Sequence, residues 1–142
     1  MTLAQDMTAQ MTAALRKAGV RVTRQRIALL AVLVGADDHP DAEELYKRTK
    51  RVEPAVSLAT VYRTLSVLEA EGVVQRHSFE GGGARFEATG PAHHDHIVDL
   101  DSGEVFEFNS DKIERLQEQI AAELGYDLVH HRMELYCRRR KP

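Results

Sequence analysis

Apolar residues recur at helical spacing along the first 72 residues, in four segments that start and stop at capping residues. The first predicted helix ends at Gly19, because glycine is favoured just past the end of a helix. The second is capped by Thr23, and its periodicity predicts one buried face. The residues expected on that face are Ile27, Leu30, Ala31 and Val34.

Two further helices and a hairpin complete a predicted N-terminal domain. Asp41 is the expected cap of a helix that runs to Arg51, and Ser57 caps one that runs to Glu71. The inward face of this last helix comprises Leu58, Val61, Leu65 and Leu68. Residues 73–79 and 84–87 then flank a glycine-rich tip and predict two paired strands. This order of elements indicates a winged helix-turn-helix domain over residues 1–88.

A short hinge at residues 89–92 leads to a second predicted domain, residues 93–142. Strands are expected at 94–100, 105–108 and 129–137. A helix at 110–124 is expected to point four residues inward, namely Ile113, Leu116, Ile120 and Leu124. The fold class is therefore α+β. Because so small a domain cannot bury all its apolar faces alone, we expect a homodimer.

Charge differs between the two halves of the 142-residue chain. The whole chain has 19 Lys/Arg and 22 Asp/Glu, so it is not a polycation that coats nucleic acid. Residues 1–88 hold 12 basic and 11 acidic side chains, whereas residues 89–142 hold 7 and 11. The single Cys137 excludes an intrachain disulfide. No secretory signal or membrane-spanning run is visible, which predicts a cytoplasmic protein without membrane contact.

The polar face of the predicted helix 57–71 suits DNA reading. Arg63 lies opposite the apolar stripe, with Thr60 beside it and Tyr62 on its flank. Arginine can fork onto guanine, a tyrosine ring can contact thymine methyl groups, and hydroxyls can reach phosphates. The stretch between Met7 and Ala36 contains no acid and supplies cations for phosphates or a narrow minor groove. These cations are Arg16, Lys17, Arg21, Arg24 and Arg26.

The segment His93-His-Asp-His offers metal ligands on one face of the predicted strand. Because strand side chains alternate, His94 and His96 point the same way. A two-residue turn at 102–103 would place Glu107 opposite Val98, on this same face. Nitrogen and oxygen donors without sulfur are compatible with Fe²⁺, Mn²⁺, Zn²⁺, Co²⁺ and Ni²⁺.

The opposite face of this strand carries a second candidate set. His93 and Asp95 project there, within reach of Glu114 and of His131. By position alone His131 could equally be a hydrogen-bonded core histidine. Two further histidines, His77 on the wing and His130, are expected on the surface.

Four motifs, in their order and spacing, resemble those of the ferric uptake regulator (Fur) family. They are Ala42-Glu-Glu-Leu-Tyr-Lys-Arg, Ser57-Leu-Ala-Thr-Val-Tyr-Arg-Thr-Leu, Arg85-Phe-Glu and His93-His-Asp-His-Ile-Val-Asp-Leu. The resemblance runs from about Ala14 to Tyr136. It implies an N-terminal winged helix that binds DNA and a C-terminal domain that dimerises. It also implies a divalent metal co-repressor, Fe²⁺ or Mn²⁺.

The resemblance also implies site residues. The regulatory metal site would comprise His39, Glu87, His94, His96 and Glu107. A second site would comprise His93, Asp95, Glu114 and His131. DNA contacts would fall on Tyr62 and Arg63 in the major groove, with Arg21 in the place of a minor-groove lysine. Lys17 and Arg24 are further contacts suggested by the charge pattern, and Thr60 is one suggested by its place beside Arg63.

Two positions depart from the pattern of many relatives. Asp99 and Ser102 stand where a C-x-x-C pair binds structural zinc, so we expect no cysteine-bound structural zinc. This resembles an alphaproteobacterial branch that includes iron- and manganese-responsive members. Glu107 stands where peroxide sensors of the family typically have aspartate.

The leading hypothesis is a metal-activated repressor of metal-uptake genes that binds an A/T-rich inverted repeat. A peroxide, zinc or nickel sensor of the same fold is the alternative, as is a regulator whose metals are purely structural. A metal-dependent hydrolase is a different class, but the chain has no H-E-x-x-H motif. We therefore do not expect an enzyme.

Overall fold

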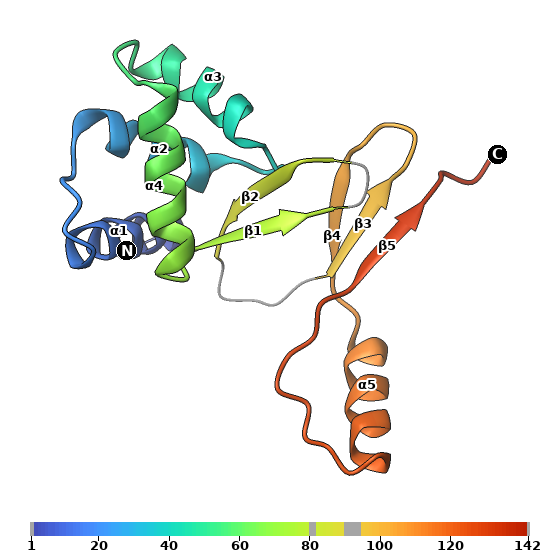
Figure 1. Cartoon of the computed structure of the whole chain (residues 1–142). Helices are drawn as coiled ribbons and strands as arrows, with labels where there is room; N and C mark the ends of the chain where they lie inside the picture. Colours follow the sequence, from blue (N-terminus) through green and yellow to red (C-terminus); the bar gives the residue numbers. More distant parts are fainter. Residues whose placement is uncertain (1, 80–81, 90–94, 142) are drawn as a thin grey trace. The chain divides into compact units, whose positions relative to one another are not determined.

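The computed structural model describes residues 2–79, 82–89 and 95–141. The chain divides into two compact units, Met1–Pro91 and Ala92–Pro142, which are described separately below (Figure 1). Among the described helices, none combines the length and the apolar character needed to cross a membrane.

The first unit contains four helices followed by a two-stranded hairpin. The elements are α1 (Leu3–Lys17), α2 (Arg24–Gly35), α3 (Ala42–Val52), α4 (Leu58–Ala70), β1 (Val74–Ser78) and β2 (Ala84–Ala88). The predicted caps are confirmed, because the side chains of Thr23, Asp41 and Ser57 each accept the backbone N–H three residues ahead. Gly72 ends α4 with a φ of +76°, a conformation that glycine adopts without strain. The predicted order of helices and wing is therefore observed.

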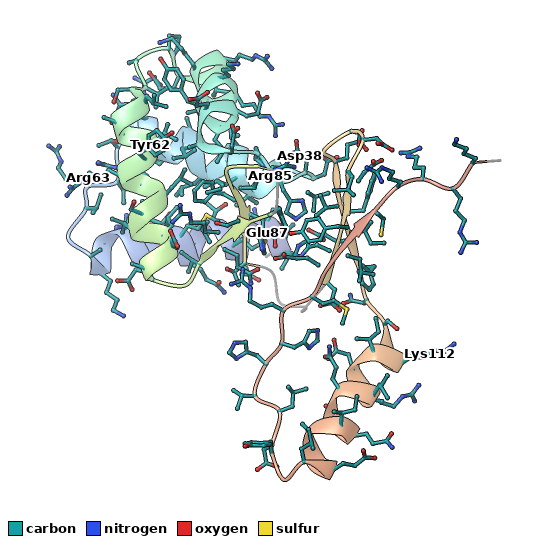
Figure 2. All side chains as sticks on the ribbon, turned by 45° about the vertical axis from the view of Figure 1, so that its right-hand side comes forward. Asp38, Tyr62, Arg63, Arg85, Glu87 and Lys112 are labelled. Carbon is teal, nitrogen blue, oxygen red and sulfur yellow. The ribbon has the colours of Figure 1, made fainter. Side chains whose placement is uncertain are left out.

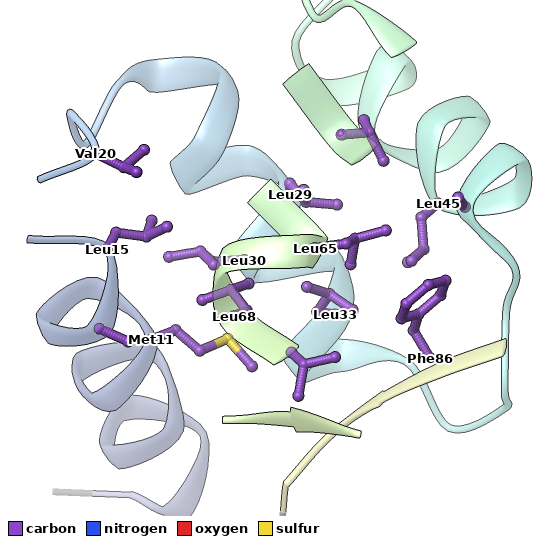
Figure 3. Packing of buried hydrophobic residues seen from close by; sticks show 14 of the residues in the cluster. Met11, Leu15, Val20, Leu29, Leu30, Leu33, Leu45, Leu65, Leu68 and Phe86 are labelled. Carbon is purple, nitrogen blue, oxygen red and sulfur yellow. The ribbon is translucent and has the colours of Figure 1, made fainter. Parts of the chain in front are cut away.

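The core of this unit lies between the four helices and the hairpin (Figure 3). Leu30 and Leu65 are almost fully buried in it, as expected. The predicted face of α2 is wrong in part, since Ile27 and Ala31 are exposed. The residues that α2 buries are Ala28, Leu29, Leu30 and Leu33. Because α2 packs against α1, α3 and α4, its buried surface is wider than, and rotated from, the single stripe that the sequence suggested.

The second unit combines a three-stranded sheet with one helix. Its elements are β3 (Asp95–Asp99), β4 (Val105–Phe108), α5 (Asp111–Glu123) and β5 (Glu134–Cys137). The strand order is β4-β3-β5, with β4 antiparallel and β5 parallel to β3. The predicted last strand is too long at its start, because β5 begins only at Glu134. The expected α+β class is observed.

The register of the β3–β4 hairpin differs from the predicted one. Glu107 pairs with His96, whereas the two-residue turn had placed it opposite Val98. The turn is longer because Asp99 Oδ1 accepts the backbone N–H groups of Asp101 (2.9 Å) and Ser102 (3.3 Å). The slip is two residues, so Glu107 and His96 still share one face. The correction places the two candidate ligands directly across from each other.

The pKa of the Asp99 carboxyl in this turn is lowered by the hydrogen bonds from the Asp101 and Ser102 amides and by the Arg139 guanidinium. Because this pKa is lower in the folded state than in the unfolded chain, the ionised carboxylate stabilises the fold above about pH 4. This stabilisation is lost as the pH falls further. We expect Asp99→Asn, which keeps an acceptor oxygen, to lower the urea midpoint at pH 7 less than Asp99→Ala. The deficit of Asp99→Asn should shrink at acid pH. Asp101→Asn, at an exposed side chain, is the control; an equal loss there would contradict the role of the turn.

The inward face predicted for α5 is wrong for a single chain. Leu116, Ile120 and Leu124 are 55%, 47% and 70% exposed, although they share one side of the helix. The cap prediction at Ser110 is confirmed by its hydrogen bond from the Ile113 amide. The apolar stripe exists, but α5 buries none of its residues within the described part of one chain.

Candidate metal centre and nucleic-acid interface

Two predicted ligands meet in the first unit. His39 lies in the loop before α3, and Glu87, which Figure 2 labels, lies on β2. His39 Nε2 is 3.1 Å from Glu87 Oε2, and both side chains are buried. The loop is tied to the strand, since the Phe86 N–H donates to the Pro40 carbonyl at 2.9 Å. The fold therefore brings an imidazole and a carboxylate together across 48 residues of sequence.

The expectation that His77 lies on the surface is wrong. His77 is 6% exposed, and its Nε2 is 2.6 Å from Glu87 Oε1. Its ring stacks on Phe79 at 5.2 Å with an interplanar angle of 13°, and it meets the ring of His39 edge-on at 5.8 Å. A signal was present in the hairpin register, which pairs Gln75 with Glu87 and so places His77 diagonally beside that carboxylate.

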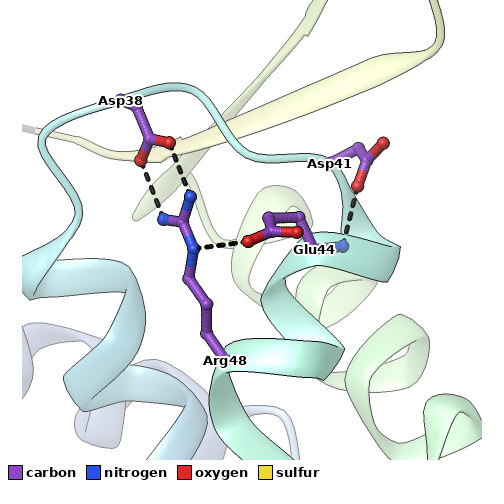
Figure 4. Close-up of polar contacts among 4 residues, drawn as sticks. All are labelled: Asp38, Asp41, Glu44 and Arg48. Carbon is purple, nitrogen blue, oxygen red and sulfur yellow. Dashed lines mark hydrogen bonds and ion pairs between the residues drawn. The ribbon is translucent and has the colours of Figure 1, made fainter.

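The loop that carries His39 is held by a charged clamp (Figure 4). Arg48 binds both carboxylate oxygens of Asp38, at 2.8 and 2.6 Å, and its Nε donates to Glu44 at 3.0 Å. These hydrogen bonds lower the pKa of Asp38 and raise that of Arg48, which keeps the pair ionised. Since Asp41 caps α3 through the Glu44 amide, the loop is fixed on both sides of His39.

In the second unit, the central strand β3 presents candidate ligands on both faces. His96 is buried and pairs with the exposed Glu107 on β4. His93 and His94, which were expected to contribute to the two sites, lie outside the described residues.

The other face of β3 brings three predicted residues together. Asp95 is 1% exposed, and its Oδ1 lies 2.8 Å from His131 Nε2. Glu114, in the first turn of α5, has its Oε1 3.6 Å from the same nitrogen. One donor atom from each of the three lies within 4.8 Å of the others. A divalent first-row cation fits such a compact set of nitrogen and oxygen donors.

The candidate DNA surface lies on α4. Tyr62 is 49% exposed and Arg63 extends outward from the helix (Figure 2), as the periodicity predicted. The Thr60 hydroxyl accepts a hydrogen bond from the Ser57 hydroxyl at 2.9 Å within the helix cap. The buried part of α4 includes Thr64, whereas Leu58, which was expected inward, is 38% exposed.

The basic residues before α4 divide into two kinds. Lys17 and Arg24 are largely exposed, with side chains 3.3 Å from Glu71 and 3.8 Å from Glu53. Arg21 is also exposed. Arg26, by contrast, is hydrogen-bonded within the unit, because it donates to the Thr64 hydroxyl and to the Arg21 carbonyl. The first of these hydrogen bonds links α2 to α4.

Comparison with known proteins supports these assignments of fold and motif. The model of the ferric uptake regulator family matches residues 17–136. The chain belongs to this family. A ferric uptake regulation protein of Brucella abortus is 55% identical over 127 residues, which cover 89% of this chain and 90% of the relative. The family members are metal-responsive transcription regulators, so this Fur-family chain is a regulator and not an enzyme.

Solved Fur-family structures share the fold. A structure described as a zinc-bound manganese uptake regulator is 41% identical, with a TM-score of 0.77. That match covers 98% of this chain and 100% of the other. The ferric uptake regulator from Pseudomonas aeruginosa, described with manganese, is 44% identical, with a TM-score of 0.76. It covers 92% of this chain and 98% of the other.

Proposed function

We propose that this Fur-family chain is a homodimeric repressor that Fe²⁺ or Mn²⁺ activates to bind an A/T-rich inverted repeat at metal-uptake genes in the cytoplasm. The observation that carries the proposal is the presence in each unit of preorganised nitrogen and oxygen donors. The first unit offers His39 with Glu87, and the second offers His96 with Glu107. A relative described with manganese, and another described as a manganese uptake regulator with zinc bound, support a divalent first-row metal at this site.

The proposed regulatory site draws its ligands from both units. They are His39, Glu87, His94, His96 and Glu107. When bound, the cation supplies a fixed charge shared by donors on separate folding units. The consequence for the protein is a smaller range of angles between the units, and therefore a fixed spacing of the two α4 helices in a dimer. The population of dimers able to bind DNA rises with metal, because this arrangement of the units binds the metal more tightly than the arrangement that cannot bind DNA.

The second proposed site serves the fold of the dimerisation unit. Its residues are His93, Asp95, Glu114 and His131. Because Asp95 is on β3, Glu114 on α5 and His131 before β5, ligation there joins the sheet to the helix. With Asp99 and Ser102 in place of a cysteine pair, this joint replaces a cysteine-bound zinc as the metal support of the unit.

The proposed DNA contacts separate into two roles. Arg63 and Tyr62 would read base edges in the major groove, where an arginine fork recognises guanine and a tyrosine ring meets thymine methyl groups. Lys17, Arg21, Arg24 and Thr60 would contact the backbone or the minor groove, which adds affinity on any sequence.

The orientation of the half-sites tests the proposed operator. Two-fold symmetry of a dimer requires an inverted repeat, because each copy presents the same helix related by rotation. With saturating Mn²⁺ and fixed salt, we expect tight binding to a duplex with inverted A/T-rich half-sites. The same half-sites arranged as a direct repeat should bind no better than scrambled DNA. Equal binding to both arrangements would overturn the symmetric-dimer proposal.

If the exposed apolar stripe of α5 lies in the dimer interface, a charge placed in that stripe should weaken the dimer. Ile120→Lys places a charge in the stripe, and each apolar side chain buried at an interface contributes about 1.5–3 kcal/mol. The dissociation constant of the dimer, measured by sedimentation, should therefore rise by roughly ten- to a hundredfold. Gln119→Lys adds the same charge at the preceding residue, which lies outside the stripe, and should leave the dimer intact. A dimer of wild-type strength for Ile120→Lys would show that α5 is not in the interface.

A further inference from the structure

We propose that His77 is a positioning residue for the regulatory metal site, which it serves by orienting the Glu87 carboxylate. The inference rests on the proposed function, because it takes Glu87 as a ligand. His77 itself is assigned no metal contact. Its part is to hold one carboxylate oxygen of Glu87 so that the other oxygen is presented beside His39.

The geometry of Glu87 supports this division of its two oxygens. Oε1 is 2.6 Å from His77 Nε2, while Oε2 is 3.1 Å from His39 Nε2. Glu87 is 8% exposed, so water has little access to compete for either oxygen. Two imidazoles that approach different oxygens fix the rotation of a carboxylate which would otherwise turn about its last side-chain bond.

The ring of His77 is held in place by its own surroundings. It stacks on Phe79, which is 4% exposed, and it meets the His39 ring nearly perpendicularly, at 71°. Phe79 also meets the His39 ring edge-on at 6.2 Å. His77 is on β1 and Phe79 directly follows that strand. Glu87 is on β2, and His39 is in the loop before α3. All of them lie in the first unit, so this half of the site needs no residue of the second unit.

Such preorganisation has a defined thermodynamic effect. A glutamate that rotates freely must lose side-chain entropy on binding a cation, whereas one already fixed does not. Hydrogen-bonded partners of ligating carboxylates typically change metal affinity by about 10- to 100-fold. We therefore expect His77 to change affinity by this factor without itself being a ligand.

Two substitutions separate the hydrogen bond from ring packing. His77→Phe keeps a ring against Phe79 but cannot donate to Glu87. His77→Gln loses the ring but keeps an N–H donor. Each is made in the full chain that also carries His131→Ala, which removes one ligand of the second proposed site. Co²⁺ is titrated in competition with a chelator, and its visible absorption and the urea midpoint of the metal-free protein are recorded.

The expected result is a loss of Co²⁺ affinity of roughly 10- to 100-fold for His77→Phe and rescue to within about threefold for His77→Gln. The visible spectrum of bound Co²⁺ should be unchanged in His77→Gln, because no ligand is lost. If both variants lower the urea midpoint but bind Co²⁺ like the parent, His77 is merely structural and the proposal is overturned. A changed ligand-field spectrum in His77→Gln would also overturn it, since His77 would then be a ligand.

A third variant separates failure of this inference from failure of the proposed site. His39→Ala in the same background must lose Co²⁺ affinity if the proposed regulatory site is correct. Loss in His39→Ala with wild-type affinity in His77→Phe overturns only the role of His77. Wild-type affinity in His39→Ala overturns the ligand assignment, and the role of His77 with it.

Discussion

Replacing His39 with alanine is expected to abolish the stimulation of DNA binding by Mn²⁺ while the protein remains folded. The side chain packs in the loop that Arg48 holds, and its nitrogen lies 3.1 Å from Glu87. Without this imidazole, the first unit keeps only one of its two proposed ligands, Glu87. Because couplings between two sites are typically 5- to 150-fold, operator affinity at saturating Mn²⁺ should fall by about that factor. Fluorescence anisotropy on the inverted repeat measures the effect.

His130→Ala is the matched control for this substitution. His130 is exposed, belongs to neither proposed ligand set and lies in the second unit. It should retain the full response to Mn²⁺. A His39→Ala protein that responds to Mn²⁺ as strongly as the control would show that the loop before α3 supplies no regulatory ligand.

Arg63→Ala is expected to lose sequence discrimination more than general affinity. A good arginine–guanine fork contributes about 1–3 kcal/mol against the wrong base, which is about 5- to 150-fold. Affinity for the operator should fall by this factor, while affinity for random DNA at the same salt changes little. Competition between labelled operator and unlabelled random duplex measures the ratio directly.

Lys17→Ala provides the contrasting case. Lys17 lies 3.3 Å from Glu71 in the free protein and is highly exposed, so it is suited to a phosphate contact. Its removal should weaken operator and random DNA alike and lower the salt dependence by about one ion. If Arg63→Ala also weakened both duplexes equally, α4 would not be the base-reading helix.

Local sequence signals predicted most of the first unit, because they act over a few residues. Thr23, Asp41 and Ser57 cap helices where expected, since a cap requires only a side-chain oxygen and the next turn of backbone. The face of α2 was predicted less well. Its burial depends on three neighbouring helices, whose positions the spacing of Ile27 and Ala31 does not encode.

The candidate sites show the same contrast. The face shared by His96 and Glu107 followed from alternation, but their direct pairing depended on the Asp99 side chain lengthening the turn. His77 was missed because a histidine on a wing is usually exposed, and its partner Glu87 lies ten residues away on the next strand. The contact of Asp95 with His131 spans 36 residues, and the family resemblance pointed to it where periodicity alone left alternatives.

We propose above all that a divalent metal switches this protein into a DNA-binding form. The most direct test is anaerobic titration of Mn²⁺ into metal-stripped protein, followed by anisotropy of an A/T-rich inverted-repeat duplex with competitor DNA at fixed salt. We expect tight binding that appears only as metal is added and disappears when a chelator removes it. Equally tight binding before and after the titration would contradict it, because DNA binding would then be constitutive and the metal sites structural.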